Sequence, residues 1–353
     1  MRAPERSVLH VLPHPGGGGE TYVDLLSAMP GYRFSRLSLA TSPTPAPWQL
    51  GRGVVEAMRR ARGHDLLHLH GEIASGLCLP LLATRPSVVT LHGLHLVRRL
   101  SGLRRTGAVL NLRAVLRAAN RTICVSQAEH DDLVRLTGSV AARRAVVVHN
   151  GVRLPPPRSE TDRAAVREEL GIAQKEPVGI WIGSLDERKD PLAAVRAAER
   201  ASVALLVVGD GPLRSQVERT AQGRVRVLGQ RGDMARLLAA ADFYVLTSRR
   251  EGLALSLLEA MAHGLPPVVT DLAENVEAID NAGVAIPLGD EGALVAALRR
   301  LVENEGERAA LGERSRRRIA ELFNAEAMIT RTRAVYDEVP RAAPKVPAQS
   351  SLV

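Results

Sequence analysis

The sequence predicts an α/β protein with two doubly wound parallel-sheet domains in tandem. Short Val/Leu/Ile segments alternate with longer Ala/Leu/Arg segments along the chain, which is typical of parallel sheets covered by helices on both faces. The length of 353 residues suits about two domains, each with its own core. A proline-rich run at 154–157 separates the halves. We therefore expect domains at 1–153 and 154–337, followed by a disordered tail at 338–353.

Six strands are predicted in each half. In the first half they span residues 8–12, 34–39, 66–70, 88–92, 122–125 and 146–149. In the second half they span 178–183, 204–208, 225–228, 243–246, 267–270 and 285–287. A basic amphipathic helix is predicted from about residue 307 to 339. Because open α/β sheets bind ligands at the carboxyl ends of their strands, we expect a site in the cleft between the two domains.

Composition and charge narrow the class of protein. Apolar residues make up 45% of the chain and aromatic residues only 3%, so the cores are built from Leu, Val and Ala. Cys78 and Cys124 have neither disulfide nor zinc-ligand spacing, which indicates reduced thiols in a cytoplasmic protein. The first apolar run is too short for a signal peptide, and no segment reaches the roughly 20 apolar residues of a membrane span. Residues 1–153 carry a net charge of +11, and the remainder carries −2.

The strongest functional signal lies in residues 251–269, which read EGLALSLLEAMAHGLPPVV. We predict a turn freed by Gly252 and a helix from near Leu253 to His263. The first helical turn offers unpaired N–H groups and the positive end of the helix dipole, which suit a phosphate.

Two glutamates, Glu251 and Glu259, flank this helix start with seven residues between them. One carboxylate can meet the group attached to the phosphates and the other the far end of a long ligand that has a diphosphate in its middle. A buried Glu259 is costly unless it is paired. Two ribose hydroxyls would pair it; the alternative is a core helix in which an arginine does so.

This segment resembles the family 4 retaining glycosyltransferases of the GT-B fold, whose hallmark is two glutamates at this spacing in such a stretch. The resemblance covers about residues 7–337 and implies two Rossmann-like domains facing a central cleft. The first domain would take the acceptor, the second the nucleotide sugar, and the final helix would cross back to the first. It further implies that Glu251 holds sugar hydroxyls, that Glu259 holds the ribose, and that backbone amides near Leu255 and Ser256 hold the diphosphate.

A glycine-rich loop, HPGGGGE at residues 14–20, follows the first predicted strand. Its glycines stop before the last position of the dinucleotide fingerprint G-x-G-x-x-G, so it is not one. Four glycines still let the backbone approach an anionic ligand closely. The family resemblance matches Gly17, Gly18 and Glu20 to an element that faces the donor diphosphate and sugar, and we include Gly19. The alternative is a flexible surface loop.

A second loop, IWIGSLDERKDP at residues 180–191, resembles the family's Gly-Arg-Leu followed by a lysine that holds the diphosphate. Lys189 has the spacing of that lysine, but Ser184 stands where the arginine is usual. Arg188 is the candidate to supply the missing charge, and the alternative is a solvated arginine on a turn.

Histidines follow two strands of the first half. His92 ends the predicted strand 88–92, where the family places a histidine beside the donor sugar; the alternative is a hydrogen-bonded structural histidine. His68 and His70 share one face of a strand, but no third ligand has convincing spacing. We therefore expect no metal and no cofactor beyond a UDP, GDP or ADP sugar as co-substrate.

These features predict a retaining glycosyltransferase that moves a hexosyl or related sugar from a nucleotide-diphosphate donor to a saccharide or lipid-linked acceptor. The resemblance implies lipid-linked saccharides or glycolipids of envelope or exopolysaccharide assembly, or natural products, as acceptors. Lys189, Arg188 and the helix amides would stabilise the departing diphosphate, and the resemblance implies that His92 lies at the sugar and that no protein nucleophile takes part. The alternatives are a GT-B sugar-nucleotide epimerase and a basic nucleic-acid-binding protein, although recognition motifs for nucleic acid are lacking.

Residues 93–121 contain seven arginines and no acid. Arg113, Arg117 and Arg121 recur every four residues, which predicts one basic helical face. Such a face can bind anionic headgroups, so we expect a cytoplasmic enzyme that docks on the cytoplasmic face of the membrane. The alternative is a solvated helix face on a soluble enzyme.

Overall fold

The computed structural model describes residues 5–42, 45–156 and 159–341, which divide into two compact units. The first unit comprises the described residues of Met1–Cys124, His130–Val148 and Ile329–Val353. The second unit comprises Val125–Glu129 and the described residues of His149–Met328. The carboxyl-terminal segment from Ile329 therefore packs with the amino-terminal half of the chain.

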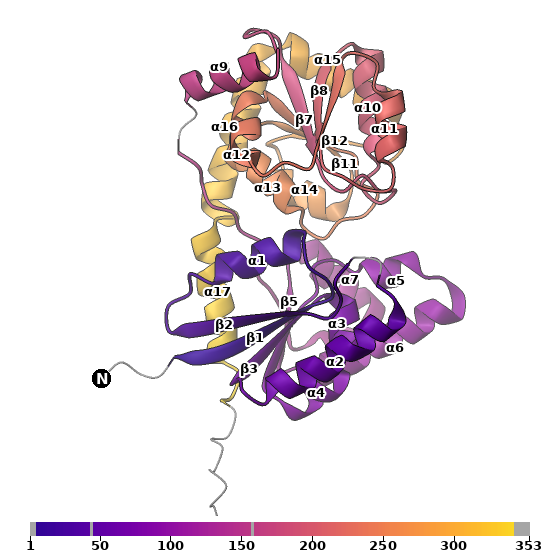
Figure 1. Ribbon diagram of the computed structural model, residues 1–353, viewed down its shortest axis with the longest axis vertical. Helices are drawn as coiled ribbons and strands as arrows, with labels where there is room; N and C mark the ends of the chain where they lie inside the picture. The colour runs from indigo at the N-terminus through magenta and orange to yellow at the C-terminus, as the bar shows by residue number, and fades with distance from the viewer. Residues whose placement is uncertain (1–4, 43–44, 157–158, 342–353) are drawn as a thin grey trace, which may run out of the picture. The chain divides into compact units, whose positions relative to one another are not determined.

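The first unit is built on a six-stranded, fully parallel sheet of order β2-β1-β3-β4-β5-β6 (Figure 1). Its strands are β1 (Arg6–Leu12), β2 (Tyr32–Ser38), β3 (Leu66–His70), β4 (Ser87–Thr90), β5 (Arg121–Cys124) and β6 (Ala145–Val147). Its helices are α1 (Gly18–Leu26), α2 (Pro47–Ala61), α3 (Gly71–Leu77), α4 (Leu79–Thr84), α5 (His95–Arg99), α6 (Gly102–Ala118), α7 (Gln127–Thr137, which begins in the second unit), α8 (Ser139–Ala142) and most of α17 (Ala325–Asp337).

The two faces of this sheet differ in polarity because side chains alternate along each strand. In β3, Leu67 and Leu69 point into an apolar core that also contains Ala57 of α2. His68 and His70 point to the opposite face, where their rings contact Tyr22 of α1. One face is thus an ordinary apolar core, and the other buries imidazoles.

The second unit contains another fully parallel sheet, of order β12-β11-β10-β7-β8-β9. Its strands are β7 (Val178–Ile182), β8 (Ala204–Val208), β9 (Val225–Gly229), β10 (Phe243–Leu246), β11 (Pro267–Thr270) and β12 (Val284–Ile286). Its helices are α9 (Glu160–Glu169), α10 (Pro191–Ala201), α11 (Arg214–Thr220), α12 (Met234–Ala240), α13 (Leu255–Ala262), α14 (Ala273–Ile279), α15 (Glu291–Glu303) and α16 (Glu305–Leu322). Apolar clusters cover both faces of the sheet. The predicted class, two doubly wound parallel sheets, is confirmed, and each predicted strand overlaps an observed one.

The single helix predicted at 307–339 is wrong, because the chain forms two helices, α16 and α17. The side chain of Asn324 accepts a hydrogen bond from the Ala327 amide at 2.8 Å and so caps the second helix. Val152 bonds to the residues on either side of this break. Its amide donates to the Phe323 carbonyl, and its carbonyl accepts from the Ala325 amide. A continuous helix would lose these contacts.

The start of the predicted disordered tail is bound to the first unit. The buried Arg6 guanidinium donates to the carbonyls of Tyr336, Val339 and Pro340 at 2.6–2.9 Å. The rest of that tail, residues 342–353, lies outside the described residues. Among the residues that the structure describes, no helix combines the length and apolar character needed to cross a bilayer.

Candidate active site

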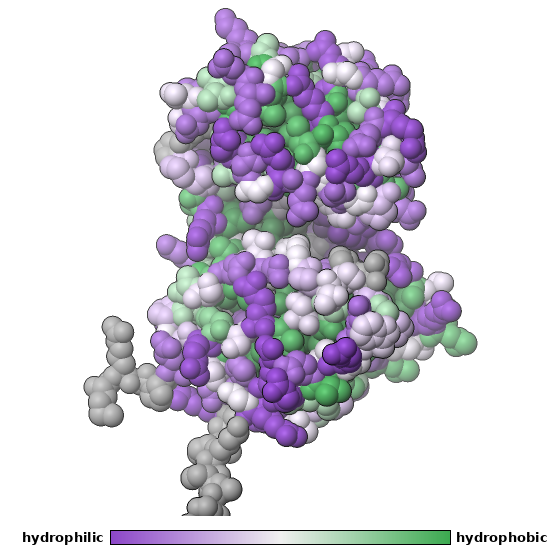
Figure 2. All heavy atoms as spheres, viewed as in Figure 1, coloured by the Kyte–Doolittle hydropathy of each residue, from purple (hydrophilic) through white to green (hydrophobic). Residues whose placement is uncertain are grey.

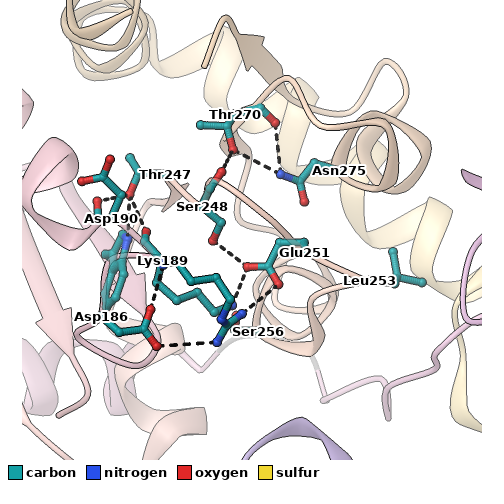
Figure 3. A network of polar contacts seen from close by, with 12 residues as sticks. Asp186, Lys189, Asp190, Thr247, Ser248, Glu251, Leu253, Ser256, Thr270 and Asn275 are labelled. Carbon is teal, nitrogen blue, oxygen red and sulfur yellow. Dashed lines mark hydrogen bonds and ion pairs between the residues drawn. The ribbon is translucent and has the colours of Figure 1, made fainter. Parts of the chain in front are cut away.

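The second sheet reverses its strand order between β7 and β10, which are neighbours in space but not in sequence. At such a switch point the loops after the two strands run to opposite sides and leave a crevice in which open α/β sheets bind ligands. The loop after β7 carries Lys189, and the loop after β10 carries Glu251. The two side chains meet there, with Lys189 Nζ donating to Glu251 Oε1 at 2.5 Å (Figure 3).

Hydrogen bonds fix the loop that presents Lys189. Asp186 accepts from the Lys189 amide at 2.9 Å. Asp190 adopts a left-handed conformation with φ of 46° and caps α10. Thr247, from the loop after β10, donates to the Asp190 carbonyl at 2.7 Å and accepts from Trp181 Nε1 at 3.1 Å. The two loops are therefore tied together before any ligand arrives (Figure 3).

Glu251 is an enclosed carboxylate, with 4% of its surface exposed. It accepts hydrogen bonds from Lys189 and from Ser248 Oγ, both at 2.5 Å, and Arg188 approaches it at 3.7 Å. Burial alone would raise the pKa of Glu251, but the positive charges of Lys189 and Arg188 outweigh this and lower its pKa. Glu251 is therefore ionised at neutral pH and already paired.

Arg188 and Lys189 share this acidic partner but differ in exposure. About a third of the Arg188 side chain is exposed, and its guanidinium also lies 3.8 Å from Asp186. Lys189 is buried, and an ammonium has three N–H donors. The sequence identified both cations, yet it gave no sign of Asp186, Ser248 and Thr247, whose positions depend on the pairing of β7 with β10.

The helix after Glu251 begins at Leu255, slightly later than predicted, and Leu255 and Ser256 form its first turn. The Ser256 hydroxyl lies 2.9 Å from the Tyr244 hydroxyl. The turn before the helix is held by Asn150, whose amide donates to the Leu253 carbonyl at 2.8 Å. The amides of this first turn lack acceptors within the helix, which makes them suited to an anionic group.

Glu259 lies half-buried farther along α13, and burial raises its pKa. The core-helix alternative requires an arginine that pairs with the Glu259 carboxylate. No arginine among the described residues forms such a pair. The Glu259 backbone carbonyl accepts from the His263 amide at 3.1 Å and lies 2.9 Å from Nδ1 of His263. The carboxylate thus keeps its full capacity to accept hydrogen bonds from a ligand.

The glycine-rich loop of the first unit leads into α1. Gly16 and Gly17 have φ of 85° and 77°, which only glycine adopts readily. Gly17 is the N-cap of α1, and Gly18 and Gly19 form its first turn. A Cβ on Gly16 or Gly17 would meet no atom within 4 Å, so these positions need glycine for backbone conformation and not for lack of space.

His92 follows β4, which ends at Thr90, two residues earlier than predicted. Its φ of 58° is unusual for a residue with a side chain and is typical of functional or strained positions. Its Nε2 lies 2.9 Å from Nδ1 of His70. Burial and the nearby His95 lower the pKa of His92 to about 4, so it is neutral at pH 7.

The structure adds a histidine that sequence reasoning missed. His10 on β1 lies opposite His68 on β3, and its Nδ1 is 2.8 Å from Nε2 of His70. His10, His68 and His70 place ligand atoms within 4.8 Å of one another, which is a geometry that can hold a metal. However, the nitrogens of His68 already bond Tyr336 at 2.6 Å and Thr90 at 2.7 Å. A metal would have to displace these bonds and the one between His10 and His70.

The predicted basic helical face of Arg113, Arg117 and Arg121 is wrong. Arg121 belongs to β5 and pairs with Glu338 at 2.7 Å. Arg113 donates to the Thr137 carbonyl at 3.2 Å, at the end of α7. Of the three, Arg117 alone is exposed on α6.

The exposed part of α6 is instead its amino-terminal half. Leu103 is 91% exposed and Leu110 57%, and the intervening Arg104 and Arg105 are exposed as well. Apolar and charged side chains therefore lie together at the outer end of this helix (Figure 2).

Comparison with known proteins matches two glycosyltransferase domains. Residues 10–154 match the domain described as Glycosyltransferase Family 4, and residues 176–304 match Glycosyl transferases group 1. The chain is 30% identical over 191 residues to N-acetyl-alpha-D-glucosaminyl L-malate synthase of Bacillus anthracis, covering 51% of this chain and 50% of that protein. It therefore spans about half the length of that relative.

Two further relatives match over more of the chain. The D-inositol 3-phosphate glycosyltransferase of Kineococcus radiotolerans is 28% identical over 321 residues, covering 80% of this chain and 73% of that protein. The UDP-Gal:alpha-D-GlcNAc-diphosphoundecaprenol alpha-1,3-galactosyltransferase of Escherichia coli is 26% identical over 293 residues, covering 77% and 75%.

Solved structures share the fold. Sucrose-phosphate synthase of Thermosynechococcus elongatus superimposes with a TM-score of 0.81 at 21% identity, covering 95% of this chain and 99% of that one. HepE of Anabaena, solved in complex with UDP-glucose, superimposes with a TM-score of 0.77 at 22% identity, covering 93% and 99%. Both matches extend over the two sheets and show that the chain has the GT-B fold. The two matched domains, over residues 10–154 and 176–304, show that the chain belongs to the family 4 glycosyltransferases.

Proposed function

We propose that the protein transfers a sugar from a nucleotide-diphosphate donor to a saccharide or lipid-linked acceptor, with retention of configuration at the transferred carbon. The observation that carries this proposal is the buried Lys189–Glu251 pair at the switch point of the second sheet, just before the first turn of α13. A preorganised cation beside open helix amides suits a departing diphosphate.

Lys189 is the proposed main contact to the diphosphate. Glu251 engages one of its three N–H donors, which leaves two for phosphate oxygens. Negative charge builds on the leaving phosphate as the bond to the sugar breaks, and the ammonium, the Arg188 guanidinium and the amides of Leu255 and Ser256 would stabilise it. Glu251 keeps the ammonium in place at this step.

The remaining site residues would hold the two ends of the donor. Glu259 accepts from the ribose hydroxyls, which would replace the water around its half-buried carboxylate. Glu251 accepts from sugar hydroxyls, His92 contacts the sugar, and the backbone of Gly17–Gly19 faces the diphosphate and sugar. The acceptor attacks from the face that the leaving group vacates, and the departing phosphate takes its proton, so no protein nucleophile or metal takes part.

We propose a UDP sugar as the first donor to test and a lipid-linked saccharide of envelope or exopolysaccharide assembly as the acceptor. HepE was solved with UDP-glucose, and the Escherichia coli relative is named for UDP-Gal and for a diphosphoundecaprenol acceptor. The family matches do not favour the epimerase and nucleic-acid-binding alternatives.

A screen of donors tests the proposal. We expect one of UDP-, GDP- or ADP-sugars to raise the melting temperature, since a ligand at about 100 times its Kd stabilises by about 2.7 kcal/mol. With that donor and a lipid-linked acceptor, we expect a product with the anomeric configuration of the donor. No shift with any donor would contradict the donor site, an inverted product would contradict retention, and an epimerised donor without acceptor would favour the epimerase.

We also propose that the protein docks on an anionic membrane through the amino-terminal half of α6, where Leu103 and Leu110 flank Arg104 and Arg105. An exposed leucine can enter the interface while each arginine adds about 1 kcal/mol near anionic lipid. We expect co-sedimentation with anionic but not neutral vesicles.

Charge-reversal variants at the two ends of the same helix locate this surface. Arg104/Arg105→Glu should abolish co-sedimentation with anionic vesicles, whereas Arg117→Glu, at the other end of the same helix, should leave it nearly unchanged. Binding that ignores lipid charge, or that both variants reduce equally, would contradict this surface.

A further inference from the structure

The first unit buries a chain of three hydrogen-bonded histidines that ends at His92. Nδ1 of His10 lies 2.8 Å from Nε2 of His70, and Nδ1 of His70 lies 2.9 Å from Nε2 of His92. His10 and His70 are almost completely buried, and His92 is half-buried. The chain thus runs from the interior of the sheet to the residue proposed to contact the donor sugar.

Packing holds these rings in place. The rings of His70 and His92 stack with centroids 5.2 Å apart, and Tyr22 of α1 meets the His92 ring edge-on at 5.0 Å. The left-handed backbone of His92 and the φ of 101° at Gly93 further restrict where the imidazole can point. The orientation of His92 is therefore set by the unit itself.

All three imidazoles are neutral at pH 7, because burial lowers the pKa of His10 to about 3, of His92 to about 4 and of His70 well below its ordinary value. Each ring then carries one N–H, and each of the two hydrogen bonds needs one proton. Only two arrangements satisfy both conditions. Either every proton is on Nδ1, or every proton is on Nε2.

The environment of His10 distinguishes the two arrangements. Nε2 of His10 is buried and has no hydrogen-bond partner among the described residues. Protons on Nε2 would bury an N–H with no acceptor, whereas protons on Nδ1 leave only a lone pair there, and orphaned buried N–H groups are the rarer case. The arrangement with protons on Nδ1 is the better one.

We infer that His70 and His10 are positioning residues that hold His92 with its proton on Nδ1, so that His92 donates a hydrogen bond to an oxygen of the donor substrate. That this oxygen belongs to a nucleotide sugar rests on the proposed function. In this arrangement Nε2 of His92 accepts from His70 and is not available to the substrate. His92 therefore binds as a fixed donor and does not accept a proton from a sugar hydroxyl.

A matched pair of substitutions at His70 separates positioning from packing. The amide nitrogen of asparagine lies where Nδ1 of histidine does, so His70→Asn can still donate to His92 but loses His10. The amide of glutamine reaches the place of Nε2, so His70→Gln keeps His10 but loses His92. We expect His70→Gln to lower kcat/KM about tenfold, mainly in kcat, and His70→Asn to stay within about threefold of wild type.

His68→Gln is the control, because His68 is equally buried in the same cluster but bonds Tyr336 and Thr90 instead of the chain. We expect it to lose stability like the His70 variants and to keep its kcat/KM. Equal losses of kcat/KM in His68→Gln, His70→Asn and His70→Gln would overturn the positioning role.

Nitrogen NMR of ¹⁵N-histidine-labelled protein reads the tautomer without donor or acceptor. We expect His92 to be protonated on Nδ1 in the wild type and to become a mixture of tautomers in His70→Gln but not in His70→Asn. A wild-type His92 protonated on Nε2 would overturn the inference. Protonation on Nδ1 in a protein that binds no sugar nucleotide would instead overturn the proposed function and leave the histidine chain intact.

Discussion

Acidification should destabilise the first unit strongly, because folding requires four histidines, three of them buried and His92 half-buried, to stay neutral. Burial lowers the pKa of His10 to about 3 and of His92 to about 4, and it places the pKa values of His68 and His70 well below the ordinary 6.5. As the pH falls below 6.5, the unfolded chain binds protons that the folded unit cannot. The stabilising contribution of neutral imidazoles is therefore complete above pH 6.5 and is lost as the pH falls toward the folded pKa values.

The size of the effect follows from proton linkage. At pH 5.5, one unit below the unfolded pKa, each such histidine costs about 1.4 kcal/mol, so the four together cost about 6 kcal/mol. This is comparable to the whole stability of many domains, roughly 5–15 kcal/mol. Burial raises the pKa of Glu72 in the same unit, which acts in the opposite direction because acid favours its folded form. The opposite effect of this one carboxyl offsets only a small part of the free energy that the four imidazoles cost.

Urea unfolding followed by circular dichroism at pH 7.5, 6.5 and 5.5 measures this loss. We expect the free energy of unfolding of the first unit to fall by about 6 kcal/mol between pH 7.5 and 5.5. The His68→Gln variant removes one of the four groups, so its free energy of unfolding should change with pH by about a quarter less. A free energy that changes by less than about 1 kcal/mol over this range would refute the reasoning, since it would mean that the histidines can be protonated in the folded unit.

Three substitutions test the candidate active site. Glu251→Ala should lower the free energy of unfolding by about 3–5 kcal/mol, because it leaves the buried Lys189 unpaired, and should reduce transfer at least about 100-fold; an unaltered urea midpoint would contradict the enclosed pair. Glu259→Gln should weaken nucleoside diphosphate binding by about 1–3 kcal/mol in calorimetry, and unchanged affinity would remove the ribose assignment. Arg188→Ala should weaken diphosphate binding severalfold, whereas a silent result would mean that nothing replaces the arginine absent at Ser184.

The fold was predictable because its strands are short apolar runs bounded by turns, and such runs are visible without tertiary contacts. The break between α16 and α17 was not, since the helical periodicity continues through Asn324 and only the contact with Val152 interrupts it. Arg121 was assigned to the helical face for a similar reason. The four-residue spacing of the arginines continues in the sequence beyond Ala118, where the helix ends.

Most residues of the site could be predicted from the sequence, but the contacts between them could not. Lys189 and Glu251 could each be identified from local motifs, yet they are 62 residues apart, and their ion pair depends on β7 lying beside β10. His10 escaped notice because its partnership with His70 requires β1 to pair with β3. The enclosure of Glu251 by Lys189 and Ser248 was not predicted either, since it depends on the same pairing of strands.

The central claim is that Lys189 holds the diphosphate of a nucleotide donor. Calorimetric titration of UDP and of uridine into wild type, Lys189→Ala and Lys175→Ala tests it directly, with Lys175 as an exposed lysine of the same unit. We predict that Lys189→Ala lowers the affinity for UDP at least about tenfold and hardly changes the affinity for uridine, because the contact is to phosphate. Lys175→Ala should change neither affinity. Equal UDP affinities in wild type and Lys189→Ala, or equal losses for UDP and uridine, would contradict the account.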